Sequence, residues 1–198
     1  MRSLILASES AVRADLLRRA GLTVQVQPAR IDEPALREAL QAEGASPRDM
    51  ADALAEEKAL KVARRCPDGL VLGCDQVLDL DGHALGKPAD AAAARARLMV
   101  LQGRMHRLWT AAVLYDRGQP VWREVAEARL WMRPFTLEWL EGYVDRAGWA
   151  LTGTAGGYAV EEIGVQLFER IEGDHFAILG LPLVPLLAAL RRRGDIPA

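Results

Sequence analysis

The sequence has few of the side chains that most often hold zinc. Its 198 residues include two cysteines, Cys66 and Cys74, which are too few and wrongly spaced for a zinc site, and their surroundings do not favour a disulfide. The three histidines, His83, His106 and His175, are not spaced as a metal triad. No Ser-His-Asp or Cys-His order stands out. We therefore expect neither a zinc protein nor a hydrolase built on a catalytic triad.

Long apolar runs are also missing. The chain begins MRSLILASESAVR, where polar residues follow within a few positions, so it does not resemble a signal peptide. The run FAILGLPLVPLLAAL, residues 176–190, is interrupted by two prolines and a glycine. The 25 basic and 27 acidic side chains nearly balance, so bulk charge predicts no binding to nucleic acid or to an anionic membrane. We expect a cytoplasmic protein without a membrane segment.

Lysine is scarce as well. It occurs only at positions 58, 61 and 87, while the other 22 basic residues are arginine. A compact ammonium differs from a guanidinium as a contact for phosphate or carboxylate, so Lys58 and Lys87 stand out as candidates for a specific role.

What the chain does contain is ample apolar material and alternating helix and strand patterns. With 51% apolar residues it fits one domain, residues 1–198, of two lobes sharing a core. No linker or repeat interrupts the alternation, which predicts an α/β fold with a largely continuous sheet. We expect strands at 3–7, 23–29, 71–80 and 164–174, and one on each side of a turn at 117–120. We expect helices at 8–22, 46–66, 90–103, 135–148 and 181–194, and a short helix after the acidic turn at 31–33.

Two carboxylates are candidates for chemistry. Asp75 follows the apolar stretch VLG, and we expect it at a strand end, the usual edge of a ligand crevice in open α/β sheets. An acid there can bind a divalent cation or act as general base for a water, although an ordinary turn residue is the alternative. Glu33, in the acidic turn IDE, is a second carboxylate of the same kind.

Three loops are candidates for binding an anion or a base. The first, SESAVR, offers Ser8, Ser10 and Arg13 at a helix N-terminus, where unpaired N–H groups favour anions, unless it is only an ordinary helix cap. The second holds Lys87 between glycine and proline, and the Asp81-Gly82 hairpin signal before it brings this lysine back toward Asp75. The third, TGTAGGYAVEE at 152–162, is glycine-rich and is either a base or phosphate contact or a plain flexible loop.

Eight pieces of the chain, in order, resemble the Maf family of nucleoside triphosphate pyrophosphatases. They are LILASESAVRADLLRRAGL, IDE, LAEEKA, GCDQV, GKP, LQGRMHRLWTA, AGGYAVEEIG and ILGLPL, which together extend from position 4 to about position 190. The resemblance implies a Maf/inosine-triphosphatase-like α/β fold, with a long mixed twisted sheet flanked by helices and a central cleft between two lobes. It also implies hydrolysis of a nucleoside triphosphate to the monophosphate and pyrophosphate with a divalent cation, Mg²⁺ or Mn²⁺, and leaves a homodimer open.

The resemblance assigns roles residue by residue. The family's loop serine and second arginine correspond to Ser8 or Ser10 and to Arg13, and its acid after the second strand to Glu33. Its aspartate in the GCDQV element corresponds to Asp75 and its two lysines to Lys58 and Lys87, while the threonine after His106 corresponds to Thr110. Asp75 and Glu33 are the implied metal ligands.

Several departures point to a branch of the family. The first loop arginine is absent, because Ala11 and Val12 replace the usual proline and arginine, and Gln76 follows Asp75 where a threonine is common. Together with Glu161, these features resemble the branch that acts on 7-methyl-GTP. The branch that acts on dTTP and UTP carries a glutamine at the position of Glu161. The alternatives that stay open are a dTTP or UTP pyrophosphatase, a nucleotide-binding regulator of septum formation without turnover, and a nucleotidyltransferase.

Overall fold

The computed structural model describes residues 2–197 and contains a mixed sheet flanked by helices, which confirms the expected α/β fold. Within that range the sheet has seven strands in the order β2-β1-β3-β5-β6-β7, with β4 paired to β3. The strands are β1 (Leu4–Leu6), β2 (Val24–Val26), β3 (Leu70–Leu80), β4 (His83–Leu85), β5 (Met105–Asp116), β6 (Gln119–Met132) and β7 (Phe168–Glu172). β1 is parallel to β2 and β3, and the other pairs are antiparallel.

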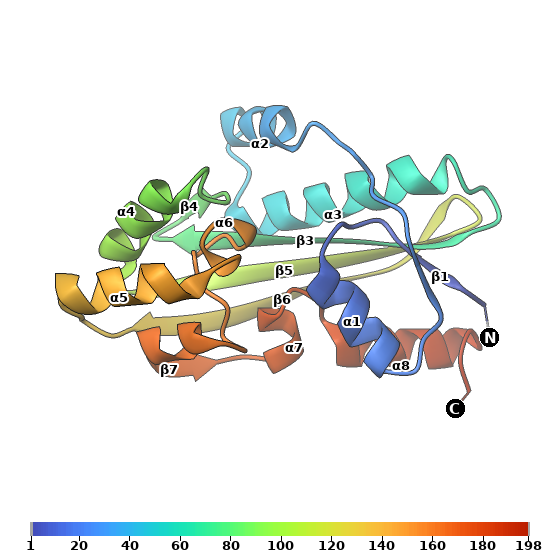
Figure 1. Ribbon diagram of the computed structural model, residues 1–198. Helices are drawn as coiled ribbons and strands as arrows, with labels where there is room; N and C mark the ends of the chain where they lie inside the picture. Colours follow the sequence, from blue (N-terminus) through green and yellow to red (C-terminus); the bar gives the residue numbers. More distant parts are fainter. Residues whose placement is uncertain (1, 198) are drawn as a thin grey trace.

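The helices cover both faces of the sheet and one of its ends (Figure 1). They are α1 (Ala11–Arg19), α2 (Glu33–Ala42), α3 (Pro47–Ala63), α4 (Ala91–Leu101), α5 (Leu137–Ala147), α6 (Ala150–Gly153), α7 (His175–Ile178) and α8 (Leu183–Arg193), with a 3₁₀ turn, η1, at Ile163–Leu167. In Figure 1, α3 lies along one face of the long strands, α1 and α8 lie on the other side, and α4 and α5 lie at one end. None of the helices in residues 2–197 has the length and apolarity needed to cross a bilayer.

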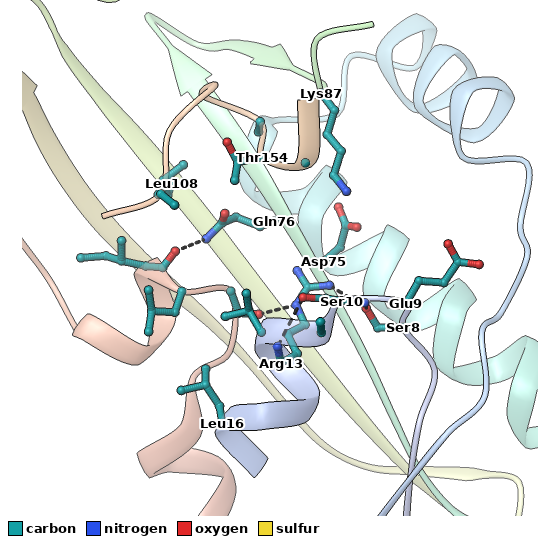
Figure 2. Close-up of a pocket in the computed structure, with 18 of the residues that line it drawn as sticks. Ser8, Glu9, Ser10, Arg13, Leu16, Asp75, Gln76, Lys87, Leu108 and Thr154 are labelled. Atoms are coloured by element: carbon teal, nitrogen blue, oxygen red, sulfur yellow. Dashed lines mark hydrogen bonds between the residues drawn. The ribbon is translucent and has the colours of Figure 1, made fainter. Parts of the chain in front are cut away.

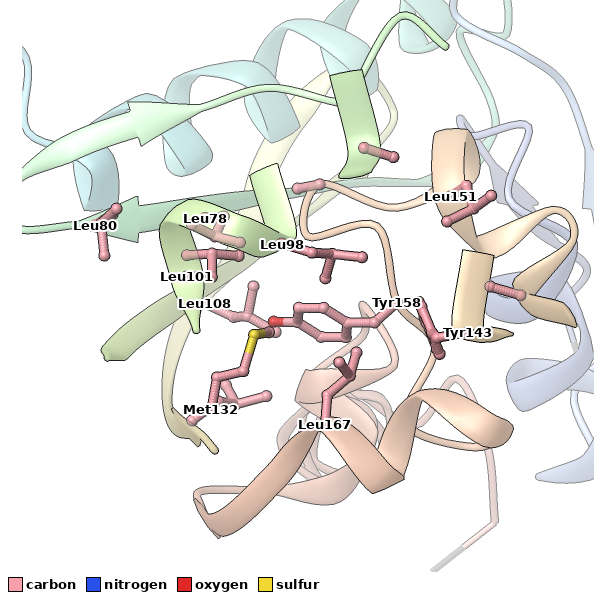
Figure 3. Packing of buried hydrophobic residues seen from close by; sticks show 14 of the residues in the cluster. Leu78, Leu80, Leu98, Leu101, Leu108, Met132, Tyr143, Leu151, Tyr158 and Leu167 are labelled. Carbon is pink, nitrogen blue, oxygen red and sulfur yellow. The ribbon is translucent and has the colours of Figure 1, made fainter. Parts of the chain in front are cut away.

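Three hydrophobic clusters hold these layers together. One packs α3 against β3 and β5, a second packs α1 and α8 against the opposite face, and a third fills the end of the sheet beneath α4 and α5. Figure 3 shows the third cluster, in which Tyr158 lies among leucines from β3, α4 and β5. Because β3 and β5 contribute side chains to all three clusters, the two ends of the molecule share their long strands.

The hairpin signal was correct. Asp81 and Gly82 connect β3 to β4 with φ values of 53° and 85°, as a turn with two left-handed residues requires. Other expectations need correction. Asp75 lies inside β3, as the strand expected at 71–80 implies, so the expectation that it lies at a strand end was wrong: β5 pairs with β3 on both sides of it.

The remaining corrections concern segment boundaries. Glu33 is the first residue of α2, with Asp32 as its cap, so it does not lie in a turn. Residues 164–167 of the strand expected at 164–174 belong to the 3₁₀ turn η1 instead, and the strand β7 begins at Phe168 and ends at Glu172. The expectations missed α6 and α7, whose four residues each are too few to show a helical period.

Candidate functional site

The site lies where β3 loses a neighbour. β1 pairs with β3 only as far as Leu72, and β4 begins to pair with it at Leu78. Among the strands of residues 2–197, none therefore lies beside the edge of β3 between them, which includes Asp75 and Gln76. A cavity of about 1080 Å³ opens there. This is at the upper end of the roughly 300–1,000 Å³ typical of small-molecule sites.

Two acids and two cations form a compact network in this cavity. Lys58 Nζ contacts Glu33 Oε2 at 2.8 Å and also Asp75 Oδ1. Arg37 Nη2 lies 3.1 Å from Glu33 Oε1 and 3.1 Å from Asp75 Oδ2. Burial opposes ionisation of Glu33, but Lys58 and Arg37 outweigh it and lower the pKa of Glu33 to about 2. Both carboxylates are thus held together in spite of their like charge.

The packing of α3 on β3 puts Lys58 beside Asp75. Gly73 and Asp75 lie on the same face of the strand, because side chains alternate along it. A Cβ at Gly73 would lie 2.1 Å from the Ala55 carbonyl oxygen and 2.6 Å from the Ala59 amide nitrogen. Only glycine therefore lets α3 approach β3 this closely. Lys58 lies between Ala55 and Ala59 in α3, so the same close approach brings its side chain to Asp75.

Arg13 is built into the opposite wall of the cavity. Ser10 caps α1, with its side chain accepting from the Arg13 amide. The Arg13 guanidinium donates from Nε to the Gly180 carbonyl at 2.7 Å and from Nη1 to Ser8 Oγ at 3.1 Å and the Cys74 carbonyl at 3.0 Å. Figure 2 shows this arginine beneath Asp75, with Ser8 and Ser10 beside it. Arg13 is only 9% exposed, so it does not face solvent as an arginine in an ordinary helix cap would.

Lys87 reaches the cavity from the loop after β4. Figure 2 shows its side chain directed toward Asp75. Burial is the main cause that lowers the pKa of Lys87, with the positive charge of Arg13 next. The loop itself is tied down by Arg97 of α4, which donates to the Gly86 carbonyl at 2.9 Å and the Ala155 carbonyl at 2.7 Å. Arg97 thereby links the lysine loop to the glycine-rich loop.

Gln76 and Thr110 lie together but have different access to the cavity. Gln76 Nε2 donates to Thr110 Oγ1 at 2.9 Å and to the carbonyls of Ala177 and Ile178 at 3.1 and 3.0 Å. The Thr110 hydroxyl donates to the Ala177 carbonyl at 2.8 Å. Gln76 lines the cavity, whereas Thr110 is 1% exposed and does not. The pair holds α7, and Gly180, two residues after the end of that helix, accepts the hydrogen bond from Arg13.

The glycine-rich loop forms another wall. Gly157 has φ of 76°, but Gly153 and Gly156 are needed for space, since a Cβ there would lie 2.7 Å from Trp149 and 2.1 Å from Tyr158. Of these three glycines, only Gly157 has a backbone conformation that disfavours other residues. Glu161 is exposed and lines the cavity from this wall.

Behind this wall, Tyr158 shares a hydrogen bond of 2.6 Å with His106 Nε2. Burial lowers the pKa of His106 to about 4, so this histidine is neutral at physiological pH. It packs against Tyr158 and Phe168 and lies outside the cavity lining.

The acid pair is compatible with one divalent cation shared with a phosphate. Within residues 2–197 no group of three or more His, Cys, Asp or Glu side chains could hold a metal ion. Mg²⁺ typically takes only one or two carboxylates in nucleotide sites, with substrate phosphates and waters as its other ligands. Glu33 and Asp75 meet that need, and at present the ammonium of Lys58 lies between them.

The structure brings together nine of the ten predicted site residues in one cavity lining. These are Ser8, Ser10, Arg13, Glu33, Lys58, Asp75, Gln76, Lys87 and Glu161. Thr110 is the exception. Arg37 and Arg97 were missed, although Arg37 could have been noticed as the residue four places after Glu33 on a helix. Arg97 gives no such signal, because its partners are backbone groups of distant loops.

This chain is similar in sequence to known proteins over nearly its whole length. A protein of Ruegeria pomeroyi named nucleoside triphosphate pyrophosphatase is 50% identical over 193 residues, covering 98% of this chain and 97% of that one. A protein of Caulobacter vibrioides with the same name is 49% identical over 191 residues, covering 96% of each chain. Among solved structures, a HAM1 protein from Coxiella burnetii matches with a TM-score of 0.43 and 16% identity, over 67% of this chain and 73% of that one. The model of the family described as Maf-like protein matches residues 3–193, and the chain belongs to this family.

Proposed function

We propose that this protein hydrolyses a nucleoside triphosphate to the nucleoside monophosphate and pyrophosphate with the help of a divalent cation. The observation that carries the proposal is the cluster of Glu33, Lys58 and Asp75 in one cavity with Arg13 and Lys87. Family membership and the names of relatives near 50% identity support the same reaction.

The residues divide the work between the attacking water and the phosphates. Water attacks the α-phosphorus, the bond from that phosphorus to the bridging oxygen breaks, and pyrophosphate leaves with the bonding electrons. Asp75 accepts the proton of the water. Glu33 and Asp75 would hold the divalent cation, which when bound would neutralise negative charge on the substrate. Arg13 and Lys87 bind phosphate oxygens whose negative charge changes during the reaction. Lys58 contacts both carboxylates and keeps them close together.

Asp75→Asn tests whether the charge and basicity of Asp75 are needed for the reaction. The amide keeps the shape of the side chain but cannot accept the proton, so we expect turnover to fall by about 10²–10³-fold, the usual effect of removing one preorganised charge from a site. Release of pyrophosphate from a triphosphate panel is measured with Mg²⁺ and with Mn²⁺, and the melting temperature shows whether the variant folds. A folded Asp75→Asn protein with near-normal turnover would remove Asp75 from the mechanism.

We further propose that the base is a modified guanine, as in 7-methyl-GTP. A carboxylate accepts hydrogen bonds from the N–H groups of a guanine edge, whereas the carbonyls of uracil or thymine would be repelled. Glu161 lines the cavity and is the group that would read this edge. We expect kcat/KM for 7-methyl-GTP to exceed that for UTP and dTTP, and Glu161→Gln to narrow the difference. A preference of the wild-type protein for the pyrimidine nucleotides would instead support the dTTP and UTP branch.

Two functions of other classes make different predictions. A septum-formation regulator without turnover would bind nucleotides but release no pyrophosphate when purified. A nucleotidyltransferase would need an acceptor other than water. Pyrophosphate release in water with a single nucleotide substrate excludes both. We also expect a cytoplasmic protein with no nucleic-acid or membrane partner, and a homodimer is tested by measuring its mass in solution.

A further inference from the structure

Trp149 is exposed although it is one of the largest apolar side chains in the protein. It is 47% exposed, lies between α5 and α6, and is one of the residues that line the cavity. The other four tryptophans are only partly exposed. Gly148, with φ of 53°, ends α5 immediately before Trp149. Packing in the core does not account for this position.

The indole is nevertheless held in a fixed place. Its Nε1–H donates to Glu162 Oε1 at 2.9 Å. Gly153 leaves room for the six-membered ring, since a Cβ there would lie 2.7 Å from Cε3 of Trp149. φ of Gly153 is not positive, so the glycine is required for space and not for backbone conformation. A fixed, exposed aromatic ring at a cavity is suited to stacking on a flat ligand.

The charges on this wall differ from those on the rest of the cavity. Residues 149–162 include two acids, Glu161 and Glu162, and no lysine or arginine. The other walls carry both signs of charge, with all the cationic side chains of the cavity, Arg13, Lys58 and Lys87 among them, and also acids such as Glu33 and Asp75, so only this wall is acidic without a cation. Glu162 is engaged by Trp149, which leaves Glu161 to face a ligand. The cavity therefore suits a molecule with an anionic tail and a flat, positively charged head.

We propose that Trp149 is the stacking platform for the nucleotide base and that Glu162 fixes its ring. This rests on the proposed function, because it takes the cavity to hold a nucleoside triphosphate. N7-methylation places a positive charge on the guanine ring, and a cation is attracted to the face of an indole more strongly than a neutral ring is. Trp149 therefore selects the methylated base by charge, while Glu161 reads its hydrogen-bonding edge.

Direct binding of 7-methyl-GMP tests the platform without any need for turnover. Stacking on the indole is expected to quench tryptophan fluorescence in the wild-type protein, and Trp149→Leu should abolish most of this quenching. Trp131→Leu is the matched control, because Trp131 lies on β6, outside the cavity lining, where it packs under the Arg170 guanidinium. Unchanged quenching in Trp149→Leu would overturn the proposal.

Kinetics give the second arm. Trp149→Leu should raise KM for 7-methyl-GTP by roughly 5- to 100-fold, the range expected when one base-stacking aromatic is lost, with little change in kcat. Trp149→Phe should retain most of the affinity, and Glu162→Gln, which keeps an acceptor for the indole N–H, should affect KM less than Glu162→Ala. The ratio of kcat/KM for 7-methyl-GTP to that for GTP should fall in Trp149→Leu, and an unchanged ratio contradicts selection by charge.

The two proposals fail in different ways. If the wild-type protein releases no pyrophosphate, the proposed reaction is wrong, and the fluorescence experiment still decides whether Trp149 stacks on a base. If pyrophosphate is released normally but Trp149→Leu leaves quenching and KM unchanged, the reaction stands and the platform does not.

Discussion

Replacing Gly73 by alanine tests how α3 and β3 build the acid and lysine pair. The added methyl group would lie 2.1 Å from the Ala55 carbonyl oxygen and 2.6 Å from the Ala59 amide nitrogen, and neither backbone atom can turn away. The helix must shift by about 1 Å, and Lys58 moves with it away from Asp75; a misplacement of this size can reduce a rate by about 10²-fold.

The same shift has a cost in stability. Overpacking a tight contact typically costs about 1–3 kcal/mol. For a chain of this size each kcal/mol changes the melting temperature by about 2–4 °C, so we expect Gly73→Ala to melt about 2–12 °C below the wild-type protein. Calorimetry or thermal unfolding followed by circular dichroism measures this, and pyrophosphate release measures the rate.

Gly142→Ala is the matched control for the same substitution. Gly142 lies within α5, and the nearest atom to an added Cβ is Arg146 Nη2 at 4.0 Å. Alanine is a better helix former than glycine, so this variant should be as stable as the wild type or more stable by up to about 1 kcal/mol. If Gly73→Ala behaves like Gly142→Ala in both melting and turnover, the close packing of α3 does not position Lys58 in the way described.

Three further predictions address the loops and charges of the cavity. Arg97→Ala should raise KM by about 10-fold, because positioning contacts of two loops are lost together, and amide exchange should accelerate around Gly86 and Ala155; unchanged exchange there would contradict the link. Since burial lowers the pKa of Lys87, kcat/KM should decline with rising pH before the ordinary lysine range is reached, and Lys87→Arg, which stays protonated, should lack this decline. The pKa of Glu33 is lowered from 4.5 to about 2, so its ion pairs stabilise the fold fully above the unfolded pKa and are lost as the pH falls through about 2. The difference in melting temperature between the wild type and Glu33→Gln should therefore shrink as the pH falls from 4.5 toward 2. A constant difference over these pH values would refute this role of the Glu33 ion pairs.

The residue pattern alone was sufficient to predict the longer helices and strands. Ser46 and Pro47 mark the start of α3, and Ser46 does cap it by accepting from the Asp49 amide. Asp81-Gly82 specified its turn because it is a local conformational requirement. Asp75 was misplaced at a strand end, since the apolar run before it says nothing of β5, which continues to pair beyond it.

The candidate site, too, was predicted from the sequence only in part. The resemblance of eight ordered motifs pointed to nine residues that line the cavity, because each motif carries a residue type suited to phosphate, metal or base. It could not show that Thr110 is buried behind Gln76, or that Arg37 bridges Glu33 and Asp75. Those facts depend on which strand ends where and on how closely two elements approach.

The sequence by itself determined the α/β class, the long helices, the hairpin and the set of candidate side chains, because helical period, caps and turn residues act over a few positions. Only the tertiary structure decided where those side chains meet. The early end of β1 opens the edge of β3, the missing Cβ of Gly73 admits α3, and the turn at Gly148 leaves Trp149 at the cavity. The first two are a gap and a contact between segments that are not neighbours in the chain, which no local pattern encodes; the turn at Gly148 is local, but the fold around it places Trp149 at the cavity.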